Sequence, residues 1–336
     1  MKDILNHLIE HKTLDKDQAK GVLKQITSGE INNSQMAAFL TVYLMRSVRV
    51  EELMGFREAM LEMCIPVEIP EYGAIDLCGT GGDGKDTFNI STLASFIVAG
   101  AGQPVAKHGN VGVSSVCGSS NLLAYFGYEF TNDIDQLRDS LDRTGICFLH
   151  APLFHPAMKN VGPVRKELGV KTFFNMLGPM VNPSFPKKQL VGVFSLELAR
   201  LYAYLYQNNE VQFTVLHALD GYDEISLTGN LKWISNQGEK VYSPEDLGFQ
   251  PVKAQAIKGG DTIEASAKIF LRILQGKGSV EQESVVIANA AAALTTANPS
   301  LDYEKARVKA MDTLKNGTAL KVFKELVDPK TSIYIS

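Results

Sequence analysis

Residues 1–65 carry apolar side chains at helical spacing. One run follows Ser34, a favourable N-cap residue, and its apolar positions are Met36, Phe39, Leu40, Tyr43 and Leu44. A second run has apolar positions at Leu53, Phe56, Met60 and Leu61. Pro66 and Pro70 then interrupt the pattern, because proline lacks the backbone donor that a helix needs. We therefore predict a wholly helical N-terminal segment.

Beyond residue 72 the pattern changes to short β-type runs that alternate with helical runs. The β-type runs are 74–78, 104–106, 146–149, 189–194 and 211–216. The helical runs are 91–101, 119–126, 157–168, 196–207, 262–275 and 280–297. This alternation predicts an α/β fold, with a central sheet flanked by helices.

The two patterns predict two domains. We expect a small helical domain over residues 1–68 and a larger α/β domain over residues 72–336. The Asn-Met-Leu-Gly-Pro turn at 175–179, with Asn182-Pro183 beyond it, predicts that a segment near 172–185 returns to the helical domain.

Charge and cysteine content narrow the class of protein. The formal net charge of −4 disfavours a general nucleic-acid binder. The polar start of the chain has no signal-peptide core, and we expect no membrane span. The four cysteines lie far apart without CxxC spacing, so neither a disulfide framework nor a zinc site is expected. These features are typical of a cytoplasmic protein.

A glycine-rich stretch is the most informative part of the sequence. Glycines at 79, 81, 82 and 84 follow the apolar run 74–78, and a helical run begins near Ser91. Glycine lets backbone N–H groups approach phosphate oxygens, and a helix N-terminus favours negative charge. The order strand, glycine loop, helix therefore predicts a site for a phosphorylated small molecule.

Two familiar phosphate motifs overlap this loop, and neither fits its context. The spacing Gly79-x-Gly81-x-x-Gly84 matches a dinucleotide fingerprint, but the next strand-like run ends in Lys107 and His108 rather than in an acid. Residues 79–85 match the first seven places of a P-loop, but Asp86 stands where a hydroxyl should bind Mg²⁺. We therefore disfavour dinucleotide or nucleoside triphosphate binding.

Three further stretches carry candidate chemistry. Lys107-His108-Gly109-Asn110 leads into a glycine- and serine-rich segment that ends at Asn121, where a lysine and serine hydroxyls can serve a phosphate. The block from 155 to 179 contains Arg165, which can grip a carboxylate with two hydrogen bonds. Asp223-Glu224 follows an apolar run and offers hard oxygen ligands for Mg²⁺. Taken singly, each stretch also suits an ordinary loop, surface arginine or turn.

Together and in this order, the four stretches closely resemble the anthranilate phosphoribosyltransferase family over essentially the whole chain. The resemblance implies transfer of phosphoribose from 5-phosphoribosyl diphosphate (PRPP) to the amine of anthranilate, in tryptophan biosynthesis. It also implies Mg²⁺, with two ions per active site, and a homodimer formed through the helical domain. The related pyrimidine nucleoside phosphorylases share the glycine loop but are not expected to carry the 155–179 block.

The resemblance also implies site residues. The positions that match PRPP ligands are Gly79, Gly82, Asp83, Thr87, Asn89, Ile90, Ser91, Thr92, Lys107, His108, Gly109, Asn110, Val111, Gly112, Val113, Ser114, Ser115 and Ser119. The anthranilate positions are Gly79, Asn110 and Arg165, and the metal positions are Ser91, Asp223 and Glu224. No covalent nucleophile is expected, because stabilisation of the leaving pyrophosphate suffices for attack by an amine.

The chain departs from the usual family pattern beside its second stretch. Many members have arginine where Val111 stands, Lys-Ser at Val116-Cys117, and an acid at Asn121. With two cations missing, we expect PRPP affinity to be affected more than the reaction itself. The alternatives that stay open are a pyrimidine nucleoside phosphorylase and a non-catalytic paralogue that binds nucleic acid. The block with Arg165 disfavours the first, and the net charge and the Asp223-Glu224 pair disfavour the second.

Overall fold

The computed structural model describes residues 1–112 and 116–327, which form two compact units. The helical unit comprises Met1–Val67 and Ala151–Phe185. The α/β unit comprises Glu68–His150 and the chain from Pro186 onward. Each unit is described below by itself.

The helical unit takes in more of the chain than its N-terminal segment. The sequence predicted a return only near 172–185, whereas the whole stretch from Ala151 to Phe185 belongs to this unit. The N–H group of Ile65 donates to the carbonyl oxygen of Phe154 at 2.8 Å, and that of Val67 donates to Pro183 at 2.9 Å. The stretch joins the unit through contacts between residues far apart in sequence, which local periodicity does not reveal.

Seven helices form this unit. They are α1 (Lys2–Ile9), α2 (Lys16–Ser28), α3 (Asn33–Met45), α4 (Val50–Glu62), α8 (Ala151–Phe154), α9 (Gly162–Leu168) and α10 (Phe174–Leu177), with 3-10 turns at Pro156–Lys159 and Gly178–Met180. The predicted helical run 157–168 is thus divided into a 3-10 turn and α9. The cap of α3 is Asn32, whose side chain accepts from the N–H of Gln35 at 3.0 Å, and not Ser34.

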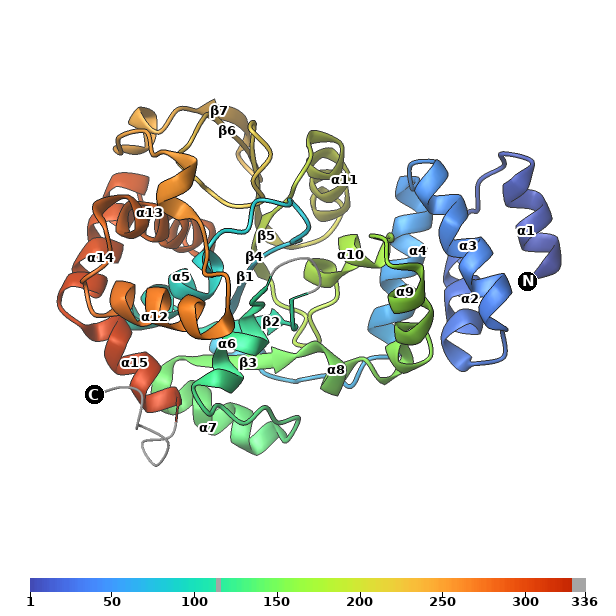
Figure 1. The fold of residues 1–336 in the computed structure, drawn as a ribbon, viewed down its shortest axis with the longest axis horizontal. Helices are drawn as coiled ribbons and strands as arrows, with labels where there is room; N and C mark the ends of the chain where they lie inside the picture. The colour runs from blue at the N-terminus through green and yellow to red at the C-terminus, as the bar shows by residue number, and fades with distance from the viewer. Residues whose placement is uncertain (113–115, 328–336) are drawn as a thin grey trace. The chain divides into compact units, whose positions relative to one another are not determined.

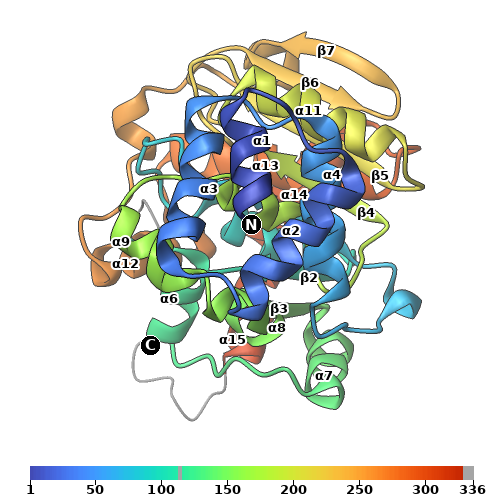
Figure 2. The same ribbon diagram turned by 90° about the vertical axis from the view of Figure 1, so that its right-hand side faces the viewer.

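Close packing of α2 on α4 depends on a glycine. The two helices lie side by side in Figure 2. A Cβ atom on Gly55 of α4 would lie only 2.2 Å from the carbonyl oxygen of Lys16 in α2. The sequence therefore permits an approach of these backbones that a larger residue would prevent.

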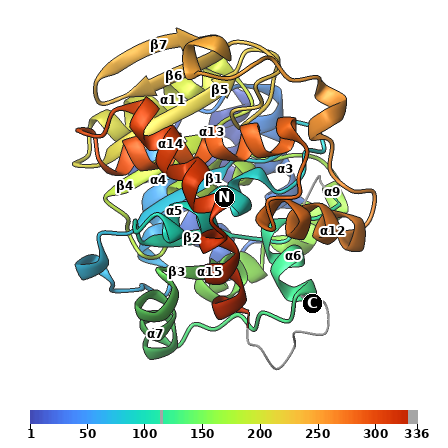
Figure 3. The same cartoon turned by 90° about the vertical axis from the view of Figure 1, so that its left-hand side faces the viewer.

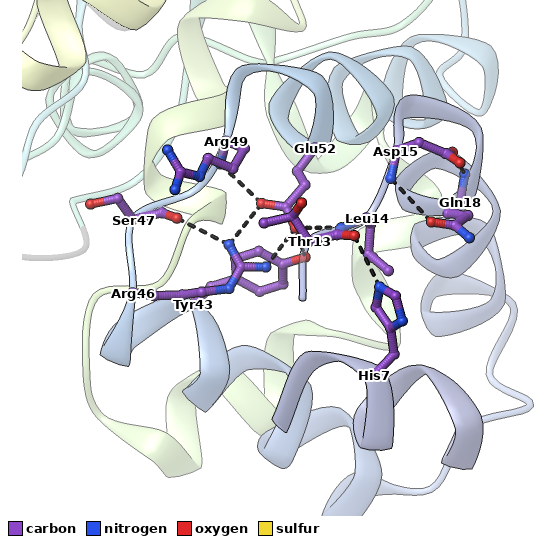
Figure 4. Close-up of polar contacts among 10 residues, drawn as sticks. All are labelled: His7, Thr13, Leu14, Asp15, Gln18, Tyr43, Arg46, Ser47, Arg49 and Glu52. Carbon is purple, nitrogen blue, oxygen red and sulfur yellow. Dashed lines mark hydrogen bonds and ion pairs between the residues drawn. The ribbon is translucent and has the colours of Figure 1, made fainter. Parts of the chain in front are cut away.

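A buried carboxylate ties the loops of the helical unit together (Figure 4). Glu52 of α4 is fully buried and accepts from the backbone N–H groups of Leu14 and Arg49, at 3.0 and 2.9 Å. The hydroxyl of Tyr43 and Nη1 of Arg46 donate to the same carboxylate, at 3.1 and 2.9 Å. These donors hold the pKa of Glu52 below its ordinary value although burial acts in the opposite direction.

We predict that Glu52→Gln destabilises the helical unit by roughly 2–3 kcal/mol, because it leaves the mostly buried Arg46 guanidinium without its counter-charge. Hydrogen exchange of the α4 amides at pH 7 measures the effect. Glu51→Gln, which changes the exposed neighbouring residue on the same helix, is the matched control and should change protection little. Equal protection in both variants would contradict the prediction.

The α/β unit is built on a seven-stranded mixed sheet, which confirms the predicted fold class. Its strands are β1 (Ile75–Gly79), β2 (Val105–Gly109), β3 (Ile146–His150), β4 (Lys188–Gly192), β5 (Gln212–Ala218), β6 (Leu231–Ser235) and β7 (Gly238–Tyr242). Their order in the sheet is β3-β2-β1-β4-β5-β6-β7. The first five strands are parallel and match the five predicted β-type runs, whereas β6 and β7 are antiparallel and were not predicted.

Helices cover both faces of this sheet (Figures 1 and 3). They are α5 (Ile90–Gly100), α6 (Ser119–Tyr125), α7 (Ile134–Thr144), α11 (Leu196–Gln207), α12 (Ile263–Leu274), α13 (Val280–Ala297), α14 (Tyr303–Lys315) and α15 (Thr318–Leu326). Helices α5 and α13 pack on one face and α11 on the other. The buried alanines 290–293 let α13 approach its neighbours closely. The sequence reading did not identify α7, α14 or α15.

Over residues 1–112 and 116–327, no helix combines the length and the hydropathy needed to cross a bilayer.

Candidate active site

The glycine loop leaves the sheet at the point where the strand order reverses. Strand β1 lies between β2 and β4, so the chain after β1 and the chain after β4 turn away on opposite sides (Figure 1). Gly79 pairs with Gly192 at the ends of these strands, and the N–H group of Thr80 donates to the carbonyl oxygen of Gly192 at 2.9 Å. In open α/β sheets, ligands bind outside the carboxyl ends of the strands at such a reversal.

Asp223 occupies this position because both strand ends are glycine. A Cβ atom on Gly79 would lie 2.3 Å from Oδ2 of Asp223, and one on Gly192 would lie 1.4 Å from its carbonyl oxygen. The carboxylate accepts from the N–H group of Gly81 at 2.6 Å. The structure thus brings Asp223 against the loop that the sequence identified, across more than a hundred intervening residues.

Glu224 faces the start of α5. Its Oε1 atom accepts from the backbone N–H of Ser91 at 2.9 Å, in the first turn of the helix. The hydroxyl of Ser91 lies 3.3 Å from the ammonium of Lys107 on β2. The three predicted metal positions, Ser91, Asp223 and Glu224, therefore lie around one place, with a cation beside them.

Burial shapes the charges of this cluster. It raises the pKa of Asp223 well above the ordinary value, and the neighbouring charges of Glu224 and Asp83 add to the effect. Burial also raises the pKa of Glu224 to about 7, although the Ser91 N–H group favours its charged form. Crowded, desolvated carboxylates of one sign favour a cation among them.

These oxygens suit a hard divalent cation bound together with a substrate. Mg²⁺ is commonly held by one or two carboxylates, with waters and phosphate oxygens completing its shell. Asp223 and Glu224 supply such carboxylates, and one oxygen of Asp83 is buried without a hydrogen-bond partner. Within the described ranges, no group of three or more His, Cys, Asp or Glu side chains is arranged to hold a metal ion by itself.

Lys107 lies beneath the loop rather than beside it. Its side chain is 2% exposed, and its ammonium donates to the carbonyl oxygen of Leu77 at 2.6 Å. Burial lowers the pKa of Lys107. The backbone N–H of the next residue, His108, donates to Oδ1 of Asp76 at 3.3 Å. The charge of Lys107 therefore acts on the site from behind the first turn of α5.

The side chain of Asn121 links described residues on both sides of 113–115. Its side-chain oxygen accepts from the N–H groups of Gly112 at 2.8 Å and Gly118 at 3.1 Å. The exposed side chains of Val111 and Val116 belong to these flanking residues. The neighbouring candidates Gly109, Asn110 and Ser119 are described as well, with the Ser119 hydroxyl 3.5 Å from the Asn110 carbonyl oxygen. Val113, Ser114 and Ser115 lie outside the described residues.

The remaining PRPP candidates flank the loop and the first turn of α5. Gly82 and Asp83 belong to the loop, and Thr87 forms a β-bridge with Lys258. The side chain of Asn89 donates to the carbonyl oxygen of Cys117 at 2.9 Å, which ties the loop to the segment after β2. The side chains of Ile90 and Thr92 are buried, so these residues present only backbone groups to a ligand.

Arg165 belongs to the helical unit, on α9. Its guanidinium lies over the ring of Phe174, 5.3 Å from the ring centroid, and Nη2 donates to Oδ1 of Asn175 at 3.3 Å. Burial lowers the pKa of this arginine. No carboxylate in the described part of the chain forms an ion pair with it. A largely buried guanidinium with only neutral partners is suited to an anionic ligand.

Further aromatic rings pack against Phe174, the ring that Arg165 contacts. The ring of Phe174 stacks on Phe173 with centroids 4.5 Å apart, and Phe173 stacks on Phe56 at the same distance. Tyr43, held by Glu52, meets Phe173 edge to face at 5.3 Å. The packing of the helical unit thereby limits the positions that Arg165 can take.

Sequence reasoning missed residues that build the site without an obvious motif. Gly192 makes room for Asp223, and Asp76 anchors the end of β2. The only sequence signal for Gly192 is that a glycine ends a predicted strand, which many turns share.

Comparison with known proteins places the chain among glycosyltransferases. The glycosyl transferase family helical bundle domain matches residues 2–64, and the a/b domain of the same family matches residues 71–320. The anthranilate phosphoribosyltransferase of Flavobacterium psychrophilum is 59% identical over 329 residues, which cover 97% of this chain and 98% of that protein.

Solved structures agree with the fold. The anthranilate phosphoribosyltransferase of Thermus thermophilus has a TM-score of 0.89 and 32% identity, over 96% of this chain and 98% of that one. The enzyme of Saccharomyces cerevisiae in complex with PRPP and Mg has a TM-score of 0.89 and 24% identity, over 98% and 97% of the two chains. Its complex with 4-fluoroanthranilate has a TM-score of 0.86 at 23% identity, over the same shares. Because the two yeast structures are less than 25% identical to this chain, they support its fold and nothing beyond it.

Proposed function

This chain belongs to the anthranilate phosphoribosyltransferase family of glycosyltransferases, and we infer that it transfers the 5-phosphoribosyl group of PRPP to the amine of anthranilate. The products are N-(5-phosphoribosyl)anthranilate and pyrophosphate, in the biosynthesis of tryptophan. The observation that carries this inference is the position of Asp223 and Glu224. The Asp223 carboxylate accepts from Gly81 in the glycine loop, and the Glu224 carboxylate accepts from Ser91 at the N-terminus of α5.

PRPP is the substrate that suits the position of Asp223 and Glu224 beside the glycine loop and α5. Asp223 and Glu224 would hold Mg²⁺, which would offer positive charge to the pyrophosphate group of PRPP. Backbone N–H groups of the loop and of α5 favour the negative charge of the same group. The proposed PRPP ligands are Gly79, Gly82, Asp83, Thr87, Asn89, Ile90, Ser91, Thr92, Lys107, His108, Gly109, Asn110, Val111, Gly112 and Ser119, together with Val113, Ser114 and Ser115 beyond the described residues.

Mg²⁺ fits the donor set of this site, because the oxygens of Asp223, Glu224 and Ser91 are hard ligands in a cluster of negative charge. The proposed number of ions is two, as the resemblance to the family implies, and the two carboxylates accept from different backbone donors, Gly81 and Ser91. When bound, Mg²⁺ would supply positive charge to the pyrophosphate oxygens.

Arg165 is the proposed partner of the anthranilate carboxylate. Its guanidinium is largely buried, has no carboxylate partner in the part of the chain that the structure describes, and is held by Phe174 and Asn175. Gly79 and Asn110 are the other proposed acceptor positions; Gly79 ends β1, and Asn110 directly follows β2.

The chemistry requires little from the protein beyond charge and position. The bond between C1 of the ribose and the pyrophosphate oxygen breaks, its electron pair leaves with pyrophosphate, and the amine nitrogen forms the new bond to C1. The nitrogen then loses one proton to solvent. Donors aimed at the leaving group stabilise the charge that develops there, so no covalent enzyme intermediate is needed.

A homodimer through the helical unit is also proposed. Ile9 on α1 and Met45 at the end of α3 are 65% and 83% exposed, and Leu44 beside Met45 is exposed as well. Apolar side chains of this size on neighbouring helices suit contact with a second copy of the chain. Light scattering after size-exclusion chromatography measures the mass of the particle.

An assay of the purified protein tests the reaction. We expect anthranilate fluorescence to fall only when PRPP and Mg²⁺ are both present, with one pyrophosphate released for each anthranilate consumed. Loss of activity with a chelator and recovery with added Mg²⁺ would identify the metal requirement. Phosphate-dependent cleavage of thymidine or uridine, with anthranilate untouched, would instead identify a pyrimidine nucleoside phosphorylase.

A further inference from the structure

Lys85, in the glycine loop, contacts the residue that precedes Asp223 and Glu224. Its ammonium lies over the ring of Tyr222, 4.7 Å from the ring centroid, and Tyr222 directly precedes Asp223. Gly221 makes room for this side chain, since a Cβ atom there would lie 3.3 Å from Cε of Lys85. The side chain of Lys85 therefore packs on the turn that leads into Asp223 and Glu224.

The ammonium of Lys85 has no anionic partner. The side chain is partly exposed, and no carboxylate in residues 1–112 or 116–327 forms an ion pair with it. Lys107 differs, because its ammonium is buried and bonded to Leu77 and near Ser91. An aromatic face holds a partly exposed ammonium only weakly, whereas a phosphate forms a charge-assisted hydrogen bond with it.

The backbone around Lys85 is fixed at both ends. Its N–H group donates to Oδ1 of Asp83 at 3.0 Å, and two residues later Thr87 pairs with Lys258. Asp86, with φ of +51°, accepts through its carbonyl oxygen from the N–H of Gly259 at 2.6 Å. Only the four-carbon side chain of Lys85 needs to move for its ammonium to change partners.

We propose that Lys85 is a further ligand of the pyrophosphate group, which its ammonium binds on leaving the face of Tyr222. This inference deepens the proposed function and rests on it. The nearness of Tyr222 to Asp223 and Glu224 assigns Lys85 to the pyrophosphate end of PRPP. The binding involves no change of covalent bonds.

The test compares Lys85→Gln with Lys85→Arg and with Lys240→Gln, which removes the same charge from β7 at the edge of the sheet. Lys85→Gln should raise the KM for PRPP and the inhibition constant of pyrophosphate roughly tenfold, as loss of a charge-assisted bond does. The KM for anthranilate should stay within twofold. Lys85→Arg should retain most of the affinity, and the effect should shrink at high ionic strength.

Calorimetric titration of pyrophosphate with Mg²⁺ into each variant separates this inference from the proposed function, because it needs no transfer reaction. Weaker pyrophosphate binding in Lys85→Gln than in Lys240→Gln supports the inference. Equal constants in the two variants, with an active parent enzyme, would overturn it. Failure of the proposed function would appear differently, as a parent protein that consumes no anthranilate.

Discussion

Replacing Asp223 with asparagine, or Glu224 with glutamine, is expected to lower kcat on the order of 100-fold or more. Each amide keeps the shape of the side chain and an oxygen that can accept from Gly81 or Ser91. What each variant loses is the negative charge that would hold Mg²⁺ beside the leaving pyrophosphate. Steady-state kinetics at saturating PRPP and anthranilate, with circular dichroism as a check on folding, measure the effect.

Asp220→Asn is the matched control, since Asp220 is exposed in the same turn and bonds to the hydroxyl of Thr228. It should leave kcat nearly unchanged. Near-normal activity of Asp223→Asn and Glu224→Gln at limiting Mg²⁺ would make both acids ordinary turn residues.

Proton binding adds a pH dependence to the same site. The raised pKa of Glu224, about 7, means that much of this carboxyl is protonated in the metal-free protein below pH 7. Mg²⁺ binds the ionised form and releases the proton, so the Mg²⁺ concentration for half-maximal activity should fall as the pH rises from 6 to 8. Glu224→Gln should lose this part of the dependence.

The second large effect is expected from Arg165→Ala, which should raise the KM for anthranilate on the order of 10–100-fold. The variant removes the charge that is proposed to bind the acceptor carboxylate, while the residues of the glycine loop are untouched. The KM for PRPP should therefore change little. Steady-state kinetics with each substrate varied in turn measure both constants.

Lys166→Ala controls for loss of a positive charge on the same helix, because Lys166 is exposed beside Arg165. It should leave both constants near their original values. If Arg165→Ala raises the KM for PRPP and not that for anthranilate, the arginine binds phosphate and its proposed role is wrong.

Local sequence determined the parts of the site that lie within one short segment. The glycine loop was readable because a strand, its glycines and the start of α5 follow one another over residues 75–92. The alternation of β-type and helical runs predicted the five parallel strands for the same reason. Such features depend on side-chain size and polarity at fixed spacing, which the sequence states directly.

The tertiary structure decided how distant segments meet. Asp223 reaches the loop because Gly79 and Gly192 end neighbouring strands, and the sheet order that makes them neighbours is not a local property. The same packing buries Lys107 beneath α5 and places the ammonium of Lys85 over the ring of Tyr222. In the helical unit, residues 151–185 pack with the N-terminal residues 1–67. The residues that form these contacts are more than eighty positions apart in the sequence. Periodicity records which face of an element is apolar, whereas which element covers that face depends on the packing of the whole chain.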